Sequence, residues 1–225
     1  RNGSEISLPA GQAGKKFAPI AIGVETQQTT GSNGLFNSYN AIGGKNEKIH
    51  YYGFFDHRNA DGYRNNSSYF TNSGYGTFTY HINKKLKVTT ELMRSHIRSQ
   101  QPGGVTDAQL QQDVKQSFRS RNWFDITWTT AAIIANYEFN EHARMNVKVF
   151  GIFGNRNSVG YLPAGGISIG DTINHSTHQY NARNVNADKY RNAGMEARFI
   201  SDYQVFHTKQ TVSAGIRIYK GTTYR

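Results

Sequence analysis

The sequence of 225 residues contains no cysteine, which excludes disulfide frameworks and thiolate metal sites. Proline is rare, with 4 residues, and the 15 acidic residues are outnumbered by 26 lysines and arginines. The formal charge of +11 favours anionic partners such as a carboxylate ligand, phosphorylated lipid or nucleic acid. No run of about 18 apolar residues occurs, which excludes a membrane-spanning helix. The mean hydropathy of -0.67 remains compatible with transmembrane strands, because their residues alternate between polar and apolar.

Alternation of apolar and polar residues is the dominant pattern along the chain, and it predicts an all-β protein. Several alternating segments extend over ten or more residues, which is the length of a tilted transmembrane strand of ~9 to 11 residues. No stretch has a helical period strong enough to compete. We expect nine strands, near residues 20–25, 35–44, 49–58, 68–82, 87–98, 124–139, 145–153, 195–200 and 211–219.

The predicted strands have one apolar and one charged face. A dry sandwich core does not hold unpaired charges, so the charged face is expected to meet water and the apolar face lipid. A soluble antiparallel sheet shows the same alternation, which therefore does not decide the class by itself. The residues predicted to face lipid are Ile20, Ile22, Val24, Leu86, Val88, Ile126, Val147, Val149, Ile216 and Ile218. The opposite face is predicted to carry Glu25, Lys87, Glu91, Asp125, Lys148, Glu196, Arg198 and Arg217.

The connections between strands favour a transmembrane sheet over a soluble one. Every second connection is a short polar turn, with the sequences KNEK, NKKLK and NEHAR. Among the alternate connections, GSNG is tight, whereas the DGYRNN loop and the stretches 99–124 and 157–187 are long. Short turns on one rim and long loops on the other are typical of an outer-membrane barrel. We therefore predict a sequential antiparallel meander that is open at both edges.

The stretch 99–124 carries a family resemblance. QPGGVTDAQL, followed by QS at positions 116 and 117 and then by RSRNWF, resembles a motif of TonB-dependent outer-membrane transporters of the ferric-dicitrate type from Bacteroidetes-like bacteria. GSNGLFNSYNAIGG and DGYRNNSSY extend the likeness upstream, and together these segments cover most of residues 17–160. Val105 and Val114 depart from the Leu and Pro that the family pattern favours.

The resemblance implies an antiparallel transmembrane β-barrel of 22 strands with an N-terminal plug. Nine strands without a plug then correspond to the first part of the barrel, with residues 1–16 as the plug-to-barrel connection and 17–225 as a partial barrel. Both ends look cut, so a longer polypeptide is expected, and the remainder of the transporter is expected as a companion.

The implied function is active uptake of a ferric chelate across the outer membrane, energised by TonB through the missing N-terminal region. Such a transporter is not an enzyme and needs no cofactor, and its barrel contacts outer-membrane lipid and lipopolysaccharide. Two alternatives stay open. One is a TonB-dependent importer of another nutrient, such as a glycan or peptide. The other is a soluble secreted β-sandwich that binds a ligand.

Four arginines are candidate ligand-binding residues. Arg119 and Arg121 lie two positions apart, so an extended backbone points both guanidinium groups to one face, where they suit a carboxylate-rich chelate. The alternative is that they pair with Asp107 or Asp113 and hold the loop in shape. For Arg64 and Arg156 the same two alternatives apply, namely ligand contact or a structural role. The segment TDAQLQQDV is compatible with a short helix that Thr106 or Asp107 caps.

Other functional readings are weaker. His175 and His178 lack a third metal ligand at suitable spacing, and are expected to be solvated loop residues; no metal site is predicted. No catalytic triad, carboxylate pair or phosphate-binding glycine loop stands out. The basic residues are scattered without a nucleic-acid-binding module, so no nucleic-acid partner is predicted. The aromatic residues expected at a membrane interface or in barrel packing are Trp123, Trp128, Tyr51, Tyr52 and Tyr137.

Overall fold

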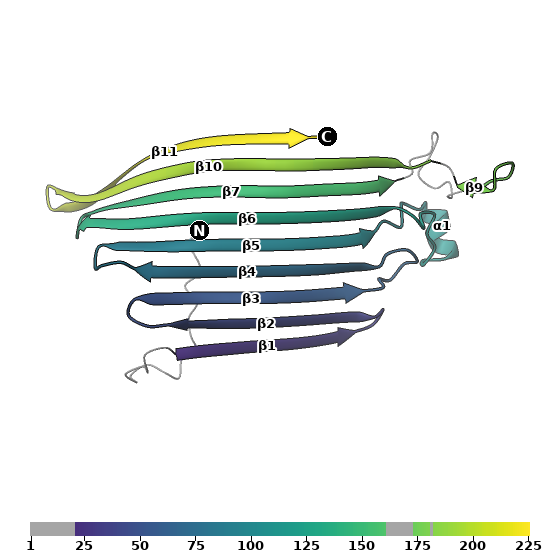
Figure 1. Cartoon of the computed structure of the whole chain (residues 1–225), viewed down its shortest axis with the longest axis horizontal. Helices are drawn as coiled ribbons and strands as arrows, with labels where there is room; N and C mark the ends of the chain where they lie inside the picture. Colours follow the sequence, from purple (N-terminus) through teal and green to yellow (C-terminus); the bar gives the residue numbers. More distant parts are fainter. Residues whose placement is uncertain (1–20, 161–172, 181) are drawn as a thin grey trace.

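The computed structural model describes residues 21–160, 173–180 and 182–225. Nine strands form one antiparallel sheet in the order β1-β2-β3-β4-β5-β6-β7-β10-β11, which confirms the predicted meander (Figure 1). Ile20 and the predicted connection 1–16 lie outside the described residues. The nine strands are β1 (Ala21–Gly31), β2 (Leu35–Lys45), β3 (Ile49–Ala60), β4 (Tyr69–His81), β5 (Leu86–Gln100), β6 (Trp123–Asn140), β7 (Ala143–Gly160), β10 (Asn184–Val205) and β11 (Thr208–Tyr224).

The connections lie at two opposite ends of the sheet, as predicted from their alternation. The short turns β2–β3, β4–β5, β6–β7 and β10–β11 share one end, which we call the turn end. The longer connections share the other, the loop end, together with the helix α1 (Asp107–Gln112) and the short strands β8 (Ile173–Asn174) and β9 (Gln179–Tyr180) (Figure 1). The predicted loop 157–187 is shorter than expected, because β7 continues to Gly160 and β10 begins at Asn184.

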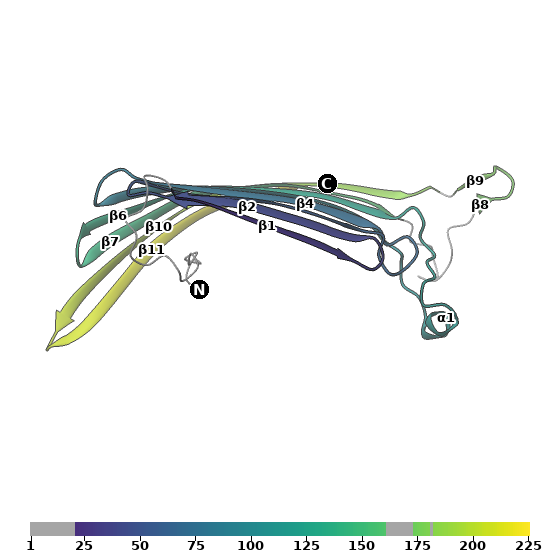
Figure 2. The ribbon, with the colours of Figure 1, turned by 90° about the horizontal axis from the view of Figure 1, so that it is seen from below.

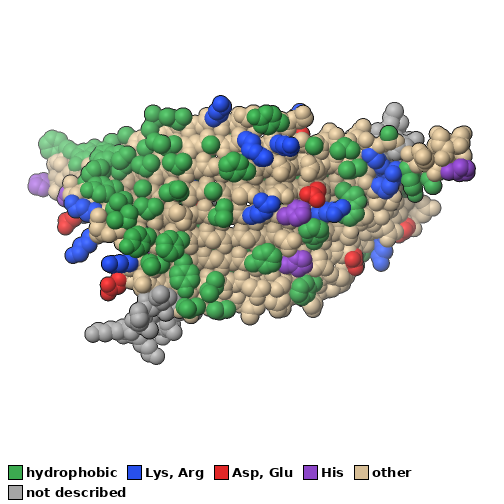
Figure 3. Space-filling model, in the orientation of Figure 1, with side chains coloured by type: hydrophobic (Ala, Val, Ile, Leu, Met, Phe, Trp, Pro, Cys, Tyr) green, Lys and Arg blue, Asp and Glu red, His purple; other side chains and the backbone are tan. Residues whose placement is uncertain are grey.

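The sheet is curved, and its two faces differ in chemistry. Figure 2 shows α1 on the concave side, and the turn of the β10–β11 hairpin bends toward the same side. Figure 3 shows the convex face, where hydrophobic side chains gather toward the turn end. The strand register places eight of the residues predicted to face lipid together on this convex face, and these are Ile22, Val24, Leu86, Val88, Val147, Val149, Ile216 and Ile218.

The apolar convex residues are unusually exposed for a folded protein. Val24 is 75% exposed and Ile218 is 65% exposed. Large apolar side chains from strands between them are less exposed but remain accessible, as for Leu92 at 57% and Phe78 at 44%, and together they form the patch that we call the apolar band. A patch of this extent marks a surface that another apolar phase or molecule covers. The convex residues of the band include Ile22, Val24, Ile42, Phe78, Tyr80, Leu92, Ile133, Tyr137, Val149, Met195, Phe199, Ile216 and Ile218.

The prediction for β6 was wrong at its loop-end half. Ile126 pairs with Ile97 and Arg156 on the concave face, whereas Asp125 pairs with Arg98 and Asn157 on the convex face. The reason is that β6 has 18 residues and continues toward the loop end past the apolar band. Beyond the apolar band the convex face no longer requires apolar side chains, so the two faces exchange character.

The protein has no second layer among its described strands. Ala41 and Ala60 are the buried hydrophobic residues there, and both lie on the concave face. A β-sandwich would bury one face of each sheet against the other, so the structure excludes the soluble sandwich alternative. The interface aromatics divide between the faces, with Trp123, Tyr51 and Tyr137 convex and with Trp128 and Tyr52 concave. Within the described ranges, no helix is sufficiently long and apolar to cross a membrane.

Candidate ligand site at the loop end

The loop between β5 and β6 is built around a short capped helix. The Thr106 side chain accepts a hydrogen bond from the Gln109 backbone N–H at 3.3 Å, and the Gln109 side chain accepts one from the Thr106 N–H at 2.9 Å. This reciprocal pair is a capping box, which satisfies two helix-terminal donors and starts α1. The helix predicted across this segment is confirmed, with Thr106 rather than Asp107 as its N-cap.

Arg64 ties this loop to the neighbouring β3–β4 loop. Its Nε and Nη2 donate to the Gln116 carbonyl oxygen at 3.2 and 2.9 Å, and its Nη1 donates to the Gly103 carbonyl oxygen at 2.8 Å. The backbone N–H of Asn65 donates to the Lys115 carbonyl oxygen at 2.9 Å. A guanidinium suits this task, because its donors form a rigid planar fork that reaches two carbonyl groups at once.

Arg119 and Arg121 are also engaged in loop contacts. Arg119 is 2% exposed, and its Nη1 donates to the Phe118 carbonyl oxygen at 3.0 Å. Arg121 lies over the ring of Tyr180 in β9, with 3.9 Å between the guanidinium carbon and the ring centroid. Such a contact is a cation–π interaction, and it joins two loops that lie far apart in the sequence. The two arginines therefore do not form one exposed clamp in this structure, and their contact with a ligand stays a prediction.

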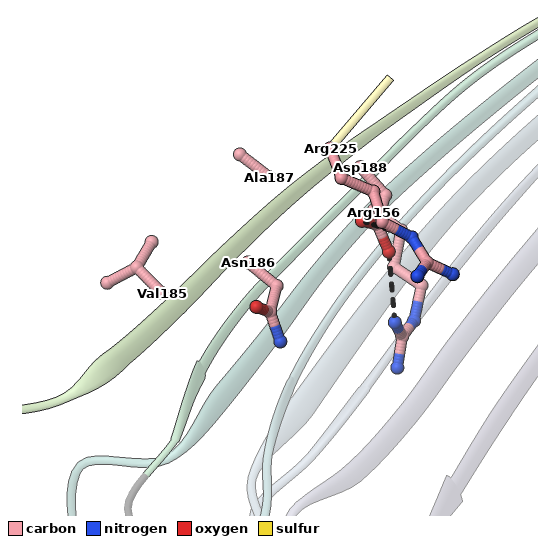
Figure 4. Close-up of a pocket in the computed structure, with 6 residues that line it drawn as sticks. All are labelled: Arg156, Val185, Asn186, Ala187, Asp188 and Arg225. Carbon is pink, nitrogen blue, oxygen red and sulfur yellow. Dashed lines mark hydrogen bonds and ion pairs between the residues drawn. The ribbon is translucent and has the colours of Figure 1, made fainter. Parts of the chain in front are cut away.

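Arg156 lines a pocket of about 330 Å³ near the loop end of β7 and β10 (Figure 4). Its Nη1 lies 3.3 Å from Oδ2 of Asp188, a carboxylate that is almost fully buried. Arg225 approaches the other oxygen of Asp188, with Nε at 3.8 Å from Oδ1. Two guanidinium groups thus flank one carboxylate, which leaves the pocket with an excess of positive charge. The remaining lining residues are Val185, Asn186 and Ala187.

The pocket is open and faces the concave side of the sheet. Arg156, Asn186 and Asp188 belong to the concave face by register, and the Arg156 side chain remains 39% exposed. The Arg156 guanidinium also lies over the ring of Phe124, at 4.9 Å from its centroid. An arginine that is fixed by a carboxylate and a ring, and still exposes N–H groups, is preorganised to bind an anion.

The structure divides the four predicted arginines among three places. Arg64 and Arg119 both lie next to Gly103, because Arg64 donates to its carbonyl group and a Cβ at Gly103 would lie 2.7 Å from Cγ of Arg119. Arg121 lies against Tyr180, and Arg156 lines the pocket. Sequence reasoning missed Asp188 and Arg225, because only the strand register shows that they meet Arg156. The described residues contain no group of three or more potential metal ligands, and His175 and His178 lie exposed in the β8–β9 turn.

Comparisons with known proteins identify the fold. No family model matches the chain, and no curated protein is similar in sequence. The solved structures that are similar in fold include two transporters. The copper transporter OprC has a TM-score of 0.59 and 10% identity, over 93% of this chain and 30% of OprC. The ferric citrate transporter FecA, in its unliganded form, has a TM-score of 0.72 and 16% identity over 91% of this chain. The chain spans 29% of the length of FecA and has the fold of that part of a transporter barrel.

Proposed function

We propose that this chain is part of the barrel of an outer-membrane transporter that takes up a ferric chelate, with ferric citrate as the model substrate. The chain supplies nine neighbouring strands of the barrel wall and the loops that surround one of its mouths. Its apolar band faces lipid, and its concave face lines the lumen. The plug and the remaining strands belong to the rest of the same protein, and TonB supplies energy through the region that precedes residues 1–16.

The observation that carries this proposal is the combination of a single-layer sheet with an exposed apolar convex face. A soluble protein rarely exposes so much contiguous apolar surface, whereas a barrel wall in a bilayer must do so. The fold similarity to FecA over 91% of the chain supports the same placement. The long connections then form the extracellular loops, since bacterial barrels carry short turns at the periplasmic rim.

Ferric citrate complexes are anionic and rich in carboxylate oxygens, and the concave loop end supplies guanidinium groups for them. Arg156 and Arg225 share Asp188, so together they keep a net positive charge that attracts such a ligand. Arg64, Arg119 and Arg121 extend the basic character through the loops above. In this proposal their role is to shape the vestibule, and they contact ligand when the loops close over it.

The test is uptake of radiolabelled ferric citrate by cells that carry the full-length protein, with and without TonB. We expect uptake only when both are present. An Arg156→Gln variant should bind ferric citrate roughly tenfold more weakly, because a charge-assisted contact is lost while the amide still donates to Asp188. The matched control is Arg144→Gln, which removes an arginine from the turn end of the same strand and the same face. Equal affinities for the two variants would remove Arg156 from the site.

A second candidate substrate is a copper species, which the fold similarity to the copper transporter OprC brings into consideration. The same cells tested with copper distinguish the two candidates. Uptake of copper and not of ferric citrate would keep the transporter proposal and replace its substrate.

A further inference from the structure

Beyond the apolar band, the convex face is basic. Toward the loop end, the convex positions beyond the band are mostly polar or charged, although Phe55, Phe153 and Val185 remain there as exposed apolar side chains. In the described strands, Asp125 is the one acidic residue of the convex face. The basic residues of this face all lie at the edge of the band or beyond it, and they are Arg94, Arg98, Lys189, Arg191 and Lys220 (Figure 3).

Arg94 and Arg191 belong to one row of paired residues. The register pairs Arg94 with Thr129, Thr129 with Phe153, and Phe153 with Arg191. Three strand spacings of ~4.8 Å separate the ends of this row, so the two arginines stand roughly 14 Å apart across the sheet. Lys189 lies in the next row toward the loop end. We call Arg94, Arg191 and Lys189 together the basic row. The residue two positions below Arg94 is Leu92, which already belongs to the apolar band.

The charges of the basic row are available to a ligand. Arg94, Lys189 and Arg191 are exposed, and within the described part of the chain none of them forms an ion pair with a carboxylate. Asp125 is occupied by His96, with 3.1 Å between Oδ1 and Nε2. Between the arginines lie the ring of Phe153 and Thr129, whose hydroxyl group accepts a hydrogen bond from Arg94 at 3.1 Å, and Thr127 and Asn155 lie in the next row. Small polar side chains flanked by cations make a shallow surface suited to phosphate oxygens.

Two aromatic rings hold this surface in position. The Arg98 guanidinium lies 5.0 Å from the ring centroid of Trp123, and the Arg191 guanidinium lies 5.9 Å from that of Phe153. Both rings belong to the convex face, on strands β6 and β7. Contact with a ring restricts the rotamers of an arginine, so the side chain loses less conformational entropy when an anion binds.

We propose that the basic row binds the phosphate groups of outer-leaflet lipopolysaccharide, whose acyl chains lie on the apolar band below. The inference rests on the proposed placement of the barrel in the outer membrane. Its basis is the continuity of the two surfaces, since Arg94 follows Leu92 and Arg191 follows Ala193 on the same face. A ligand that covers both must be an amphiphile with an anionic head. Transported substrate does not meet this surface, because it faces away from the lumen.

The position at the edge of the apolar band also explains why the site uses arginine. Lipid chains exclude water from one side of a phosphate at the band edge. A guanidinium can replace that water, because it stays charged and donates two hydrogen bonds to the phosphate. Lys220 lies one row nearer the turn end than Arg191, at the band edge. Its long apolar stem can lie along the band while its ammonium reaches the headgroup level.

The experiment uses the full-length protein in detergent and counts bound lipid by native mass spectrometry. The test variant is Arg94→Gln with Arg191→Gln. The control is Arg198→Gln with Arg217→Gln, which removes the same charge from the concave face. Diphosphoryl lipid A, its dephosphorylated form and inorganic pyrophosphate are the three probes. We expect the affinity for diphosphoryl lipid A to fall about tenfold or more in the test variant and to stay unchanged in the control.

The dephosphorylated lipid should bind both variants equally, and pyrophosphate should not displace the lipid. Equal affinity of the two variants for diphosphoryl lipid A would overturn the site, and displacement by pyrophosphate would identify a free-phosphate site in its place. Heat-modifiable migration on a gel confirms that each variant is folded. Wild-type protein recovered without detergent would overturn the membrane placement itself. Loss of ferric citrate uptake alone concerns the proposed substrate and leaves the lipid measurement valid.

Discussion

At the scale of single residues, arginine side chains determine the shape of the loop end. Arg64 makes three hydrogen bonds to two carbonyl groups. Arg121 uses its flat face instead, against Tyr180. Arg156 uses both modes, with Asp188 at one edge and Phe124 under its face. The same residue type therefore fixes loops in two places and lines the pocket beside Asp188 in a third.

An Arg64→Met variant should loosen the β5–β6 loop without unfolding the barrel. Methionine keeps the unbranched stem but removes all three donors, which leaves the carbonyl groups of Gly103 and Gln116 without this partner. Hydrogen bonds from a charged donor contribute ~1.5 to 3 kcal/mol, so local opening should become at least about tenfold more frequent. Limited trypsin digestion measures this as faster cleavage after Lys115. The control is Arg58→Met on β3, and equal cleavage rates in both variants would contradict the role of Arg64.

The sequence predicted which residue types occur at the candidate site, but it did not predict how they are arranged. The sequence singles out Arg156, but it does not show that Asp188 stands opposite on β10, because the 31 residues 157–187 separate these two register partners in the chain. Arg119 looked equivalent to Arg121 from their spacing of two. The loop backbone is not extended there, so one side chain is buried and the other lies on a ring.

At the scale of elements, alternation and turn chemistry predicted most of the sheet. Strands from β2 to β6 were located within about two residues at each end, because polar turns interrupt their alternation clearly, whereas β1, β7 and β10 extend well beyond their predicted ranges. The faces followed from the same pattern wherever a strand lies within the apolar band, as for Val147 and Val149. Above the band the constraint disappears, and Asp125 and Ile126 show that alternation alone then assigns the wrong face.

The β10–β11 turn is the element whose local conformation fits its sequence least. Val205 pairs with Thr208, so Phe206 and His207 form a two-residue turn, with φ of 45° and 67°. Two positive φ angles define a type I′ turn, which favours Asn-Gly and disfavours bulky residues. Phe206 is also 95% exposed, so little packing offsets this strain.

Replacing Phe206 and His207 by Asn and Gly should therefore stabilise the hairpin by about 1 to 2 kcal/mol. The measurement is the urea midpoint of the full-length protein refolded into lipid vesicles, which should rise. A matched exchange of Glu141 and His142, in the β6–β7 turn where no positive φ occurs, to Asn and Gly should give no such gain. A fall in the midpoint for the Phe206 variant would mean that the aromatic tip has a partner that its exposure hides.

At the scale of the whole molecule, one curved sheet separates two environments. The convex face is apolar in its turn-end half and basic above it, and the concave face carries the charges that an aqueous lumen accepts, such as Glu91, Lys148 and Arg217. Strands β1 and β11 each keep one edge without a partner strand in the described sheet. Bilayers do not tolerate open sheet edges, so the proposed barrel requires further strands to close it.

The placement of the bilayer on the apolar band makes a depth-dependent prediction for one strand. Val149 and Asn157 lie on the convex face of β7, the first within the band and the second above it. A Val149→Lys variant puts an ammonium near the middle of the hydrocarbon, where lysine costs ~2 to 4 kcal/mol, whereas Asn157→Lys meets headgroups or water and costs ~0 to 1 kcal/mol. Urea titration of the full-length protein in lipid vesicles measures both values. Similar small losses for both variants would show that lipid does not cover the band, and a large loss for Asn157→Lys would move the membrane boundary toward the loop end.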